Sequence, residues 1–450
     1  MDALCVGMFV HLDVGWMAHP FPLNSFKITS PQQVATIRGL GLTSVHWCPQ
    51  QSDDFEQRGA AVDSVDRDGG DGCEAGEADE DREVCEDRED HHDPAAVVAS
   101  HAAAAGAAAV AGTPGAIAQR RLLRSQRAAA RLCEREFNEA ARVCGRVAEI
   151  ASTHPEQARN EAETLTRTLA AKMLGAEDLC IRLLTDAAGD KASTHAINVA
   201  MISLLMGRAF GFDADDLVDL GLGALLHDIG NIELPHGLRR HDETFTPAEK
   251  RYYETHVAHG LVLARRMGLS TGATLVLAQH HEHADGSGFP LKLNTDRMTI
   301  GARIVALVDR YDSLCNPAAA AKALTPHEAL SLLFTQGNAK YDTSILSSFI
   351  RMMGVYPPGS TVQLTDDRYA MVVGVSSTRP LKPMVLVHDP RVARDDALLL
   401  DLEGAGSVGI RRSIRIAHLP TAAHEYLAPS PRVAYFFETA GAAAEAVEAG

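Results

Sequence analysis

The segment LLHDIGN, residues 225–231, decides the fold of the chain, because it ends an apolar helical run on a histidine and an aspartate. A second segment, LAQHHEHADGSGFP at 277–290, ends another apolar run on two adjacent histidines. A third segment, ALVDRYD at 306–312, places Asp309 inside an apolar helical pattern. Burying a charged carboxylate there is costly unless a cation or strong hydrogen bonds compensate. The three segments therefore predict a helical core that gathers histidine and aspartate side chains.

These residue types favour a metal site. Neutral imidazole and carboxylate together suit iron, manganese, zinc or nickel, and two such ions can share one carboxylate and activate a water molecule. Each residue alone also has a structural interpretation. A lone helical histidine such as His195 is more often a hydrogen-bonded structural residue, and a histidine after a helix interacts with the helix dipole. The joint pattern of the three segments favours metal binding.

Further out, the pattern remains helical from His195 to about Met353, with Asp213, Thr246 and Thr325 as predicted N-caps. The segment from Gln119 to Thr185 also has a helical pattern. After Pro358, the runs STVQL, YAMVVGVS and PMVLVHD predict antiparallel strands. Near the N-terminus, GMFVHL and TSVHW predict strands that flank a helix at PQQVATIRGLG. We therefore predict a mainly α fold: a helical core, a small N-terminal α+β unit and a small C-terminal β-rich appendage.

The 450 residues carry a formal charge of -17. The stretch from Asp53 to Asp93 holds 18 acidic residues and 4 arginines, so most of the excess negative charge lies there. Such a composition predicts disorder, and the charge argues against binding to a nucleic-acid polymer. The predicted domains are an α+β domain at 1–50, a disordered acidic and Ala/Gly-rich linker at 51–118, a helical connector at 119–185, the metal-binding domain at 186–355, and the β-rich appendage with its tail at 356–450.

Eight cysteines without a CxxC pair fit reduced thiols and predict a cytoplasmic protein. The N-terminus lacks a basic region followed by an apolar core, so no signal peptide is predicted. The stretch from Pro94 to Gln119 is free of charge but is too rich in alanine and glycine to favour a membrane span.

Taken together, the motifs resemble the HD-GYP family, a branch of the HD superfamily of metal-dependent phosphohydrolases. HDIGN matches most of the family's HDxGK segment, and HHEHADGSGFP matches HHE…DGxGYP with Phe289 in place of tyrosine. His195, His256 and VDRYDSL fall at the expected intervals around them. The first 50 residues also resemble a small domain of unknown function that often precedes HD-GYP domains.

The resemblance implies a helical HD-type core with two divalent metal ions, most commonly iron or manganese. It implies hydrolysis of cyclic di-GMP to pGpG or GMP through a metal-bridged hydroxide. Carried over by position, Asp228 is the catalytic residue that bridges two metals. The implied metal ligands are His195, His227, Asp228, His256, His280, His281 and Asp309. The implied substrate-binding loop comprises Gly288, Phe289 and Pro290, and in the family this loop also contacts diguanylate cyclase partners. Arg303 and Lys322 are further candidates for substrate binding because they keep a positive charge.

The chain departs from the family where a phosphate is expected to bind. Asn231 replaces the lysine of HDxGK, and Ala318 and Ala321 stand where two arginines are usual. Lys191 occupies the position at which some members carry a glutamate for a third metal, which favours two metals. Three hypotheses therefore stay open: an active cyclic di-GMP phosphodiesterase, a catalytically impaired signalling or protein-interaction module, and an HD hydrolase of another nucleotide.

Overall fold

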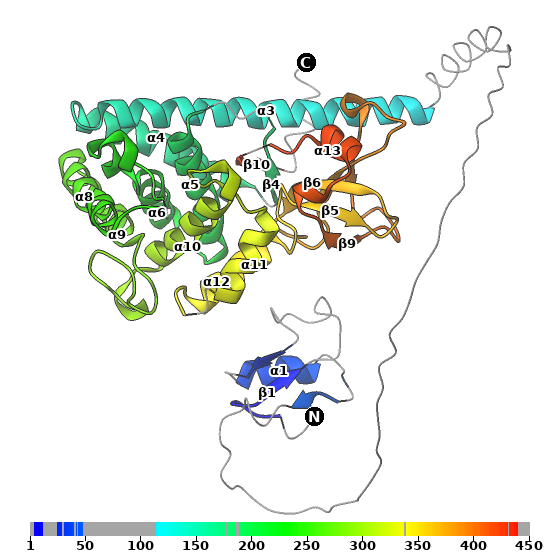
Figure 1. Ribbon diagram of the computed structural model, residues 1–450, viewed down its shortest axis with the longest axis horizontal. Coiled ribbons are helices and arrows are strands. Elements are labelled where there is room, and N and C mark those ends of the chain that lie inside the picture. The colour runs from blue at the N-terminus through cyan, green and yellow to red at the C-terminus, as the bar shows by residue number, and fades with distance from the viewer. Residues whose placement is uncertain are drawn as a thin grey trace, which may run out of the picture. The chain divides into compact units, whose positions relative to one another are not determined.

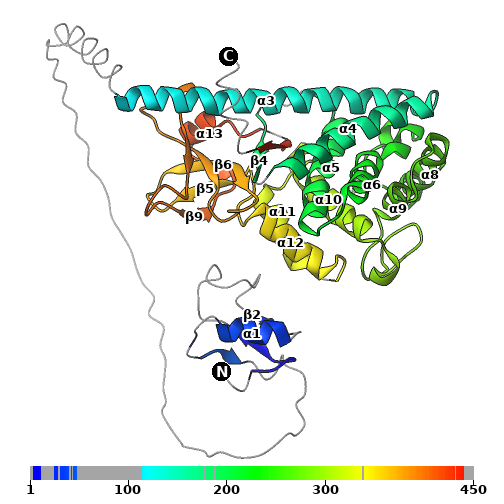
Figure 2. The ribbon, with the colours of Figure 1, turned by 180° about the vertical axis from the view of Figure 1, so that it is seen from behind.

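The computed structural model describes residues 4–11, 25–28, 31–39, 42, 44–47 and, apart from 177, 186–188, 243, 337–338 and 431, all of 114–439. It divides into one unit at Met1–Thr113 and a second at Pro114–Gly450. Figure 1 and, from behind, Figure 2 show both units. The predicted disorder at 51–93 and the predicted linker up to residue 113 lie outside the described residues, as does the tail after residue 439.

In the N-terminal unit, three short strands form an antiparallel sheet. Its central strand β1 (Phe9–His11) pairs with β2 (Ser25–Lys27) and with β3 (His46–Trp47). Helix α1 (Pro31–Gly39) adds Val34 and Ile37 to a small apolar cluster. The predicted strands at both ends of this unit and the predicted helix are thus confirmed, whereas β2 was not predicted.

The C-terminal unit opens with two long helices, α3 (Pro114–Ile150) and α4 (Pro155–Gly175). On α4, buried residues recur at three- to four-residue spacing, as they do on a helix with one face against a core. Figure 1 shows α3 lying along both the helical part and the sheet of this unit. Its first turn occupies residues 114–118, which the sequence had assigned to the Ala/Gly-rich linker.

The helical core follows, and the prediction of an HD-type helical fold is confirmed. The core contains α5 (Lys191–Ala209), α6 (Ala214–Leu226), α7 (Pro247–Glu254), α8 (His256–Met267), α9 (Thr271–Gln279), α10 (Ile300–Cys315), α11 (Pro326–Gln336) and α12 (Thr343–Met353). Helix α6 packs against α4, α5 and α9, so it lies at the centre of the core. All three predicted caps accept a backbone N–H: Asp213 from Asp216, Thr246 from Glu249, and Thr325 from Glu328.

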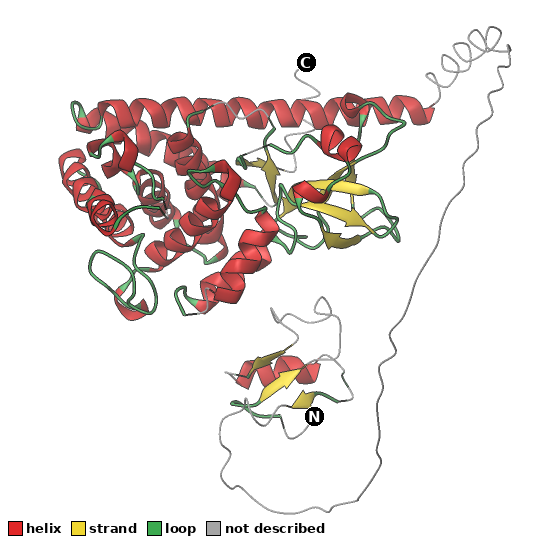
Figure 3. Ribbon diagram, viewed as in Figure 1, coloured by secondary structure: helices red, strands yellow, loops and turns green. Residues whose placement is uncertain are grey.

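Seven antiparallel strands form a sheet beside these helices, shown in yellow in Figure 3. They are β4 (Leu179–Leu183), β5 (Thr361–Leu364), β6 (Tyr369–Ser376), β7 (Met384–Val387), β8 (Leu399–Asp401), β9 (Ile410–Ser413) and β10 (Tyr435–Thr439). The main path runs β10-β4-β6-β5-β9, while β7 pairs with β6 and β8. Short helix α13 (Thr421–Leu427) precedes β10. The β-rich prediction for the runs after Pro358 is confirmed.

Strand β4 corrects one prediction, because the sequence pattern extended the helix to Thr185. Leu179–Leu183 instead pairs with β10 on one side and β6 on the other. A segment of only five residues has no decisive periodicity, and its partners lie far along the chain, so tertiary pairing overrides the local pattern. Tyr435, Phe436 and Phe437 of β10 belong to the same buried cluster as the helices. The sheet is therefore continuous with the helical core.

Within the described parts of the chain, no helix combines the length and the apolar character that a bilayer crossing requires.

Candidate metal centre

The structure brings the seven predicted metal ligands together from five helices. His195 lies in the first turns of α5, and Asp309 lies in the middle of α10. His227 ends α6 and is followed by Asp228, while His280 ends α9 and is followed by His281. His256 is the first residue of α8. Helix ends therefore supply five of these side chains, and the apolar helices α6 and α9 anchor the four that follow them in the core.

Asp228 stands between two groups of histidines. Its Oδ1 lies 3.4 Å from Nε2 of His256 and 3.9 Å from Nε2 of His280. Its Oδ2 lies 3.7 Å from Nε2 of His227 and 3.9 Å from Nε2 of His195. One group of ligand atoms comprises Asp228, His256, His280 and His281, and the other comprises His195, His227 and Asp228. This arrangement fits a carboxylate shared by two cations.

Asp309 spans the same two groups from the opposite side. Its Oδ1 lies 3.3 Å from Nε2 of His195, and its Oδ2 lies 3.6 Å from Nδ1 of His281. Two carboxylates and five imidazoles therefore face one another, and the two carboxylates carry the negative charge that divalent cations require.

Backbone carbonyls fix three of the imidazoles in one orientation. Nδ1 of His227, His256 and His280 donates to the carbonyl oxygen three residues earlier, in each case at 2.7 Å. A carbonyl oxygen only accepts, so the proton of each neutral ring sits on Nδ1 and the lone pair of Nε2 faces the cluster. Metal-binding histidines are commonly held in this way.

Asp312 holds the fourth imidazole and was not singled out in the sequence. Its Oδ2 accepts a 2.6 Å hydrogen bond from Nδ1 of His195. Its Oδ1 accepts from the side-chain amides of Asn198 at 2.7 Å and Asn316 at 2.9 Å. Asp312 is fully buried. Its position three residues after Asp309, on the same helix face, was the available signal.

Burial and neighbouring charges shift the pKa values of three clustered histidines. Burial and the neighbouring His227 and His256 together lower the pKa of His280 to about 3. Burial and His280 likewise hold the pKa of His281 well below its usual value. Burial lowers the pKa of His195, but Asp309 and Asp312 outweigh that effect and raise it well above the ordinary value. Neutral His280 and His281 beside ionised carboxylates are the protonation states that a metal needs.

Two orphaned atoms support the fit of the site to metal ions. Oδ1 of Asp228 and Nε2 of His281 are buried and make no hydrogen bond. Buried polar atoms are nearly always satisfied, so an unsatisfied oxygen and nitrogen in one cluster point to a ligand that both can bind. Mixed nitrogen and oxygen donors suit iron, manganese, zinc and nickel alike.

The predicted substrate loop is fixed to the cluster by Glu282. Its carboxylate accepts from the backbone N–H groups of Leu291 at 2.6 Å and Leu293 at 2.8 Å. Phe289 donates its N–H to the carbonyl of His281, and its ring centre lies 4.5 Å from that imidazole. A Cβ on Gly288 would lie 2.4 Å from the same carbonyl, so the close return of the loop requires glycine.

A cleft of about 1440 Å³ opens onto the cluster. Among the residues predicted to bind substrate, Gly288, Phe289 and Lys322 line it. Pro290 and Arg303 are not in its wall, and Nη1 of Arg303 instead pairs with Asp342 at 2.6 Å. The basic side chains of the wall are Lys191, Arg239, Arg240, Lys250, Lys292, Arg310, Lys322 and Lys340. Most were not predicted, because they share no motif.

Two family profiles match the chain. One, described as an HD domain, matches residues 145–345, and the other, described as a domain of unknown function (DUF3391), matches residues 1–164. The matched HD region contains all seven residues of the cluster.

Curated relatives include cyclic di-GMP phosphodiesterase PA4108 of Pseudomonas aeruginosa, 25% identical over 56% of this chain and 63% of that protein. They also include cyclic di-GMP phosphodiesterase PdeB of Borreliella burgdorferi, 25% identical over 42% of this chain and 50% of that protein. A third, 3'3'-cGAMP-specific phosphodiesterase 3 of Vibrio cholerae, is 23% identical over 39% of this chain and 38% of that protein. The chain thus spans less than two thirds of the length of these relatives.

A solved structure, Bd1817, a HDG"Y"P protein from Bdellovibrio bacteriovorus, is similar with a TM-score of 0.36 and 18% identity. The similarity covers 46% of this chain and 69% of that one.

Proposed function

The chain carries an HD domain preceded by a DUF3391 region, as its resemblance to HD-GYP proteins implied, and on this premise we propose that it is a metal-dependent phosphodiesterase of cyclic di-GMP. The proposed products are pGpG or GMP. The observation that carries the proposal is the position of Asp228 between two groups of imidazoles, with Oδ1 facing one group and Oδ2 the other.

In the proposed site, two divalent ions, iron or manganese, are held by His195, His227, Asp228, His256, His280, His281 and Asp309. When bound, such ions polarise a phosphoryl oxygen and make a water molecule nucleophilic at neutral pH. The protein orients the ligands: backbone carbonyls fix three imidazoles, and Asp312 fixes His195. Such fixed donors and charges reduce the reorganisation that accompanies reaction.

The cleft suits a large anionic substrate. Its volume of about 1440 Å³ exceeds the range of about 300–1,000 Å³ that is usual for small-molecule pockets. Eight lysine and arginine residues line the cleft, and those that face a bound phosphodiester group would offset its negative charge. The names of the relatives support the same substrate class.

The test is turnover of cyclic di-GMP by the anaerobically purified full chain, supplied with iron or manganese, with products separated by chromatography. We expect pGpG or GMP from the unaltered protein and none from Asp228→Ala. Asp215→Ala is the matched control, because Asp215 is an exposed residue at the start of the helix that leads to Asp228. Two tightly bound metals without any product would refute the phosphodiesterase proposal.

Two other functions follow from particular observations. Similarity to 3'3'-cGAMP-specific enzymes favours a parallel assay with that dinucleotide, and a clear preference for it would change the proposed substrate. Replacement of family cations by Asn231, Ala318 and Ala321 favours an impaired signalling module. Turnover that Asp228→Ala abolishes would exclude that module.

We also propose that the loop at residues 288–290 contacts diguanylate cyclase partners in the cytoplasm. Pro290 is exposed and Leu291, which follows it, is 66% exposed, so the loop presents apolar surface beside the cleft. Binding of a purified diguanylate cyclase that Leu291→Ser abolishes would support this contact, and unchanged binding would oppose it.

A further inference from the structure

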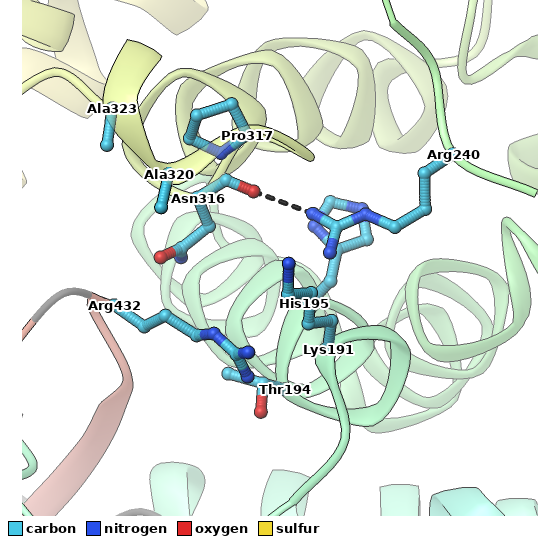
Figure 4. Close-up of a pocket in the computed structure, with 9 residues that line it drawn as sticks. All are labelled: Lys191, Thr194, His195, Arg240, Asn316, Pro317, Ala320, Ala323 and Arg432. Atoms are coloured by element: carbon cyan, nitrogen blue, oxygen red, sulfur yellow. Dashed lines mark hydrogen bonds between the residues drawn. The ribbon is translucent and has the colours of Figure 1, made fainter.

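A small niche opens beside His195, at the side of the cleft. Figure 4 shows its lining, which includes three cationic side chains: Lys191, Arg240 and Arg432. Lys191, His195, Arg240, Asn316 and Pro317 line both the niche and the cleft, so the two are continuous. Its enclosed volume is about 20 Å³, which admits one oxygen-sized group while the remainder of a ligand stays in the cleft.

Arg240 reaches the niche with one unsatisfied nitrogen. Its Nη2 donates to the carbonyl of Asn316 at 2.7 Å, while its buried Nη1 has no hydrogen-bond partner. Burial lowers the pKa of Arg240, and the nearby charge of Arg432 lowers it further, although Asp312 and Asp228 act in the opposite direction. A guanidinium that is partly buried, near another cation and short of an acceptor is a binding site for an anion.

Arg432 comes from outside the HD domain match, and the strand that follows it is fixed to the helical core. Asn316 accepts the N–H of Val433 at 2.9 Å, and its amide donates to the carbonyl of Val433 at 2.8 Å. Asn198 accepts the N–H of Tyr435 and donates to the same carbonyl. The two asparagines also hold Asp312, so one hydrogen-bond network positions both His195 and the backbone next to Arg432.

Within the described residues, neither Arg240, Arg432 nor Lys191 forms an ion pair with a carboxylate. The Nζ of Lys191 contacts only the carbonyl of Ala318 at 3.3 Å. Ala318 is one of the two alanines that replace the expected arginines, so a lysine from a different helix lies where the family's charge is missing.

We propose that Arg240 and Arg432, assisted by Lys191, bind a phosphate group of the nucleotide and thereby replace the cations lost at Asn231, Ala318 and Ala321. The β-rich appendage then supplies a substrate-binding residue to the HD domain. This inference rests on the proposed nucleotide substrate, but its anion chemistry can be measured without turnover. The phosphate belongs either to the intact cyclic dinucleotide or to the linear product.

The experiment measures binding by calorimetry to the full chain after chelation of metals, so that no hydrolysis occurs. The probes are cyclic di-GMP, pGpG and inorganic phosphate. The variants are Arg240→Gln, Arg432→Gln and the control Arg391→Gln, because Arg391 is exposed on the same appendage and lines neither the niche nor the cleft. Melting temperatures establish that each variant is folded.

We expect Arg240→Gln and Arg432→Gln each to weaken binding of cyclic di-GMP about tenfold, the usual effect of losing one charge-assisted hydrogen bond. Arg391→Gln should stay within about twofold. A comparable loss confined to pGpG and phosphate would assign the niche to the linear product. The proposal would be overturned if, for each of the three probes, both arginine variants bound as tightly as the unaltered protein. It would also be overturned if the unaltered protein bound none of the probes.

A separate kinetic assay distinguishes this proposal from the proposed function. If the metal-loaded protein fails to hydrolyse cyclic di-GMP, yet pGpG or phosphate binding depends on Arg240 and Arg432, the niche stands and the substrate assignment fails. If turnover occurs, Arg432→Gln should raise KM about tenfold and leave kcat nearly unchanged, because it removes binding that the ground state and the transition state share.

Discussion

The histidine half of the site, formed by the clustered ligand candidates, and its basic half, formed by the cationic side chains of the cleft and the adjoining niche, differ in how their side chains are held. In the histidine half, Nδ1 of His227, of His256 and of His280 each donates to the backbone carbonyl three residues earlier. In the basic half, Lys191 is exposed and reaches a carbonyl at 3.3 Å, and Arg432 is exposed as well. One half is rigid and buried, while the other consists of long side chains at the edge of solvent.

The difference indicates which half tolerates replacement. Metal ligands must meet within a few tenths of an ångström, so a shifted helix end removes a ligand and nothing else can take its place. A phosphate group accepts hydrogen bonds from many directions. A lysine or arginine side chain on another segment can therefore contact it as well as one at the usual family position. This contrast agrees with our proposals that all seven ligand positions are kept and that the phosphate-binding cations come from other positions.

Loss of Asp309 tests the rigid half most severely. Asp309→Ala removes the carboxylate that faces both His195 and His281, so we expect kcat to fall by about 10³-fold, because an ion lost from the site takes several kcal/mol of charge stabilisation with it. Elemental analysis should show fewer bound metals. Asp296→Ala, at an exposed position, is the control. Full activity of Asp309→Ala would contradict the idea that Asp309, like Asp228, holds a metal ion between the two groups of histidines.

A methyl group at Gly230 tests the packing beneath the ligands. A Cβ there would lie 2.0 Å from the backbone oxygen of His256, so the chain must shift where α8 begins. We expect Gly230→Ala to reduce the free energy of unfolding by about 3 kcal/mol in urea titrations. The matched control Gly237→Ala has no atom within 4 Å of its new Cβ and should cost less than about 0.5 kcal/mol. Similar losses in the free energy of unfolding for Gly230→Ala and Gly237→Ala would contradict tight packing beneath the histidine half.

Asp312→Asn separates positioning from ligation. The substitution removes the charge that Nδ1 of His195 contacts while keeping the side chain's shape. We expect metal affinity or activity to fall about 10- to 100-fold, as for other residues that orient metal ligands. The pKa of His195 should also fall, because Asp312 is one of the groups that raise it. A titration of this imidazole by NMR in the chelated protein checks the shift, and an unchanged titration would count against a positioning role.

The pH dependence of stability in the chelated, metal-free protein tests the burial of the histidine half. Because folding lowers the pKa of His280 from 6.5 to about 3, the unfolded chain binds more protons between those values. The metal-free protein should therefore be fully stable above pH 6.5 with respect to this group and lose stability as the pH falls below it. His281 acts in the same direction, whereas the raised pKa of His195 matters only above pH 6.5. Urea titrations at several pH values should show that the free energy of unfolding falls less steeply with decreasing pH in His280→Gln than in the unaltered protein. An equally steep fall in both proteins would contradict the assigned pKa shift of His280.

The smallest effect is expected at Lys322, in the basic half. Its side chain lines the cleft and is exposed, so one surface charge is lost in Lys322→Gln. We expect KM for cyclic di-GMP to rise about two- to fivefold at low salt, with kcat unchanged, and the difference to shrink as salt is added. A large fall in kcat would show that this half is as sensitive as the histidine half.

The sequence singled out the histidine half because His227 and His280 each follow an apolar helical run and Asp309 lies inside one. The ligand roles of these residues stay predictions. His227, His280 and Asp309 could be found from such local patterns, and the helical core and the later strands followed from periodicity. Arg240 and Arg432 could not be found, because a lone arginine on a loop carries no spacing that marks a function. Arg303 was named as a remaining cation; it does not line the cleft, and its guanidinium pairs with Asp342, so a role in substrate binding stays a prediction. Strand β4 was missed because its pairing partners are distant.

The pairing of β4 with β10 limits when the sheet and the core can finish folding during translation. Leu183 pairs with Tyr435, so roughly 250 residues must be made after β4 before its partner exists. Until then, the edge of β4 that β10 later covers has no partner strand, and the aromatic side chains of β10 are absent from the core. The nascent chain therefore carries an incomplete core until the residues of β10 have been made. Ribosome-associated chaperones are the factors expected to shield it during that interval.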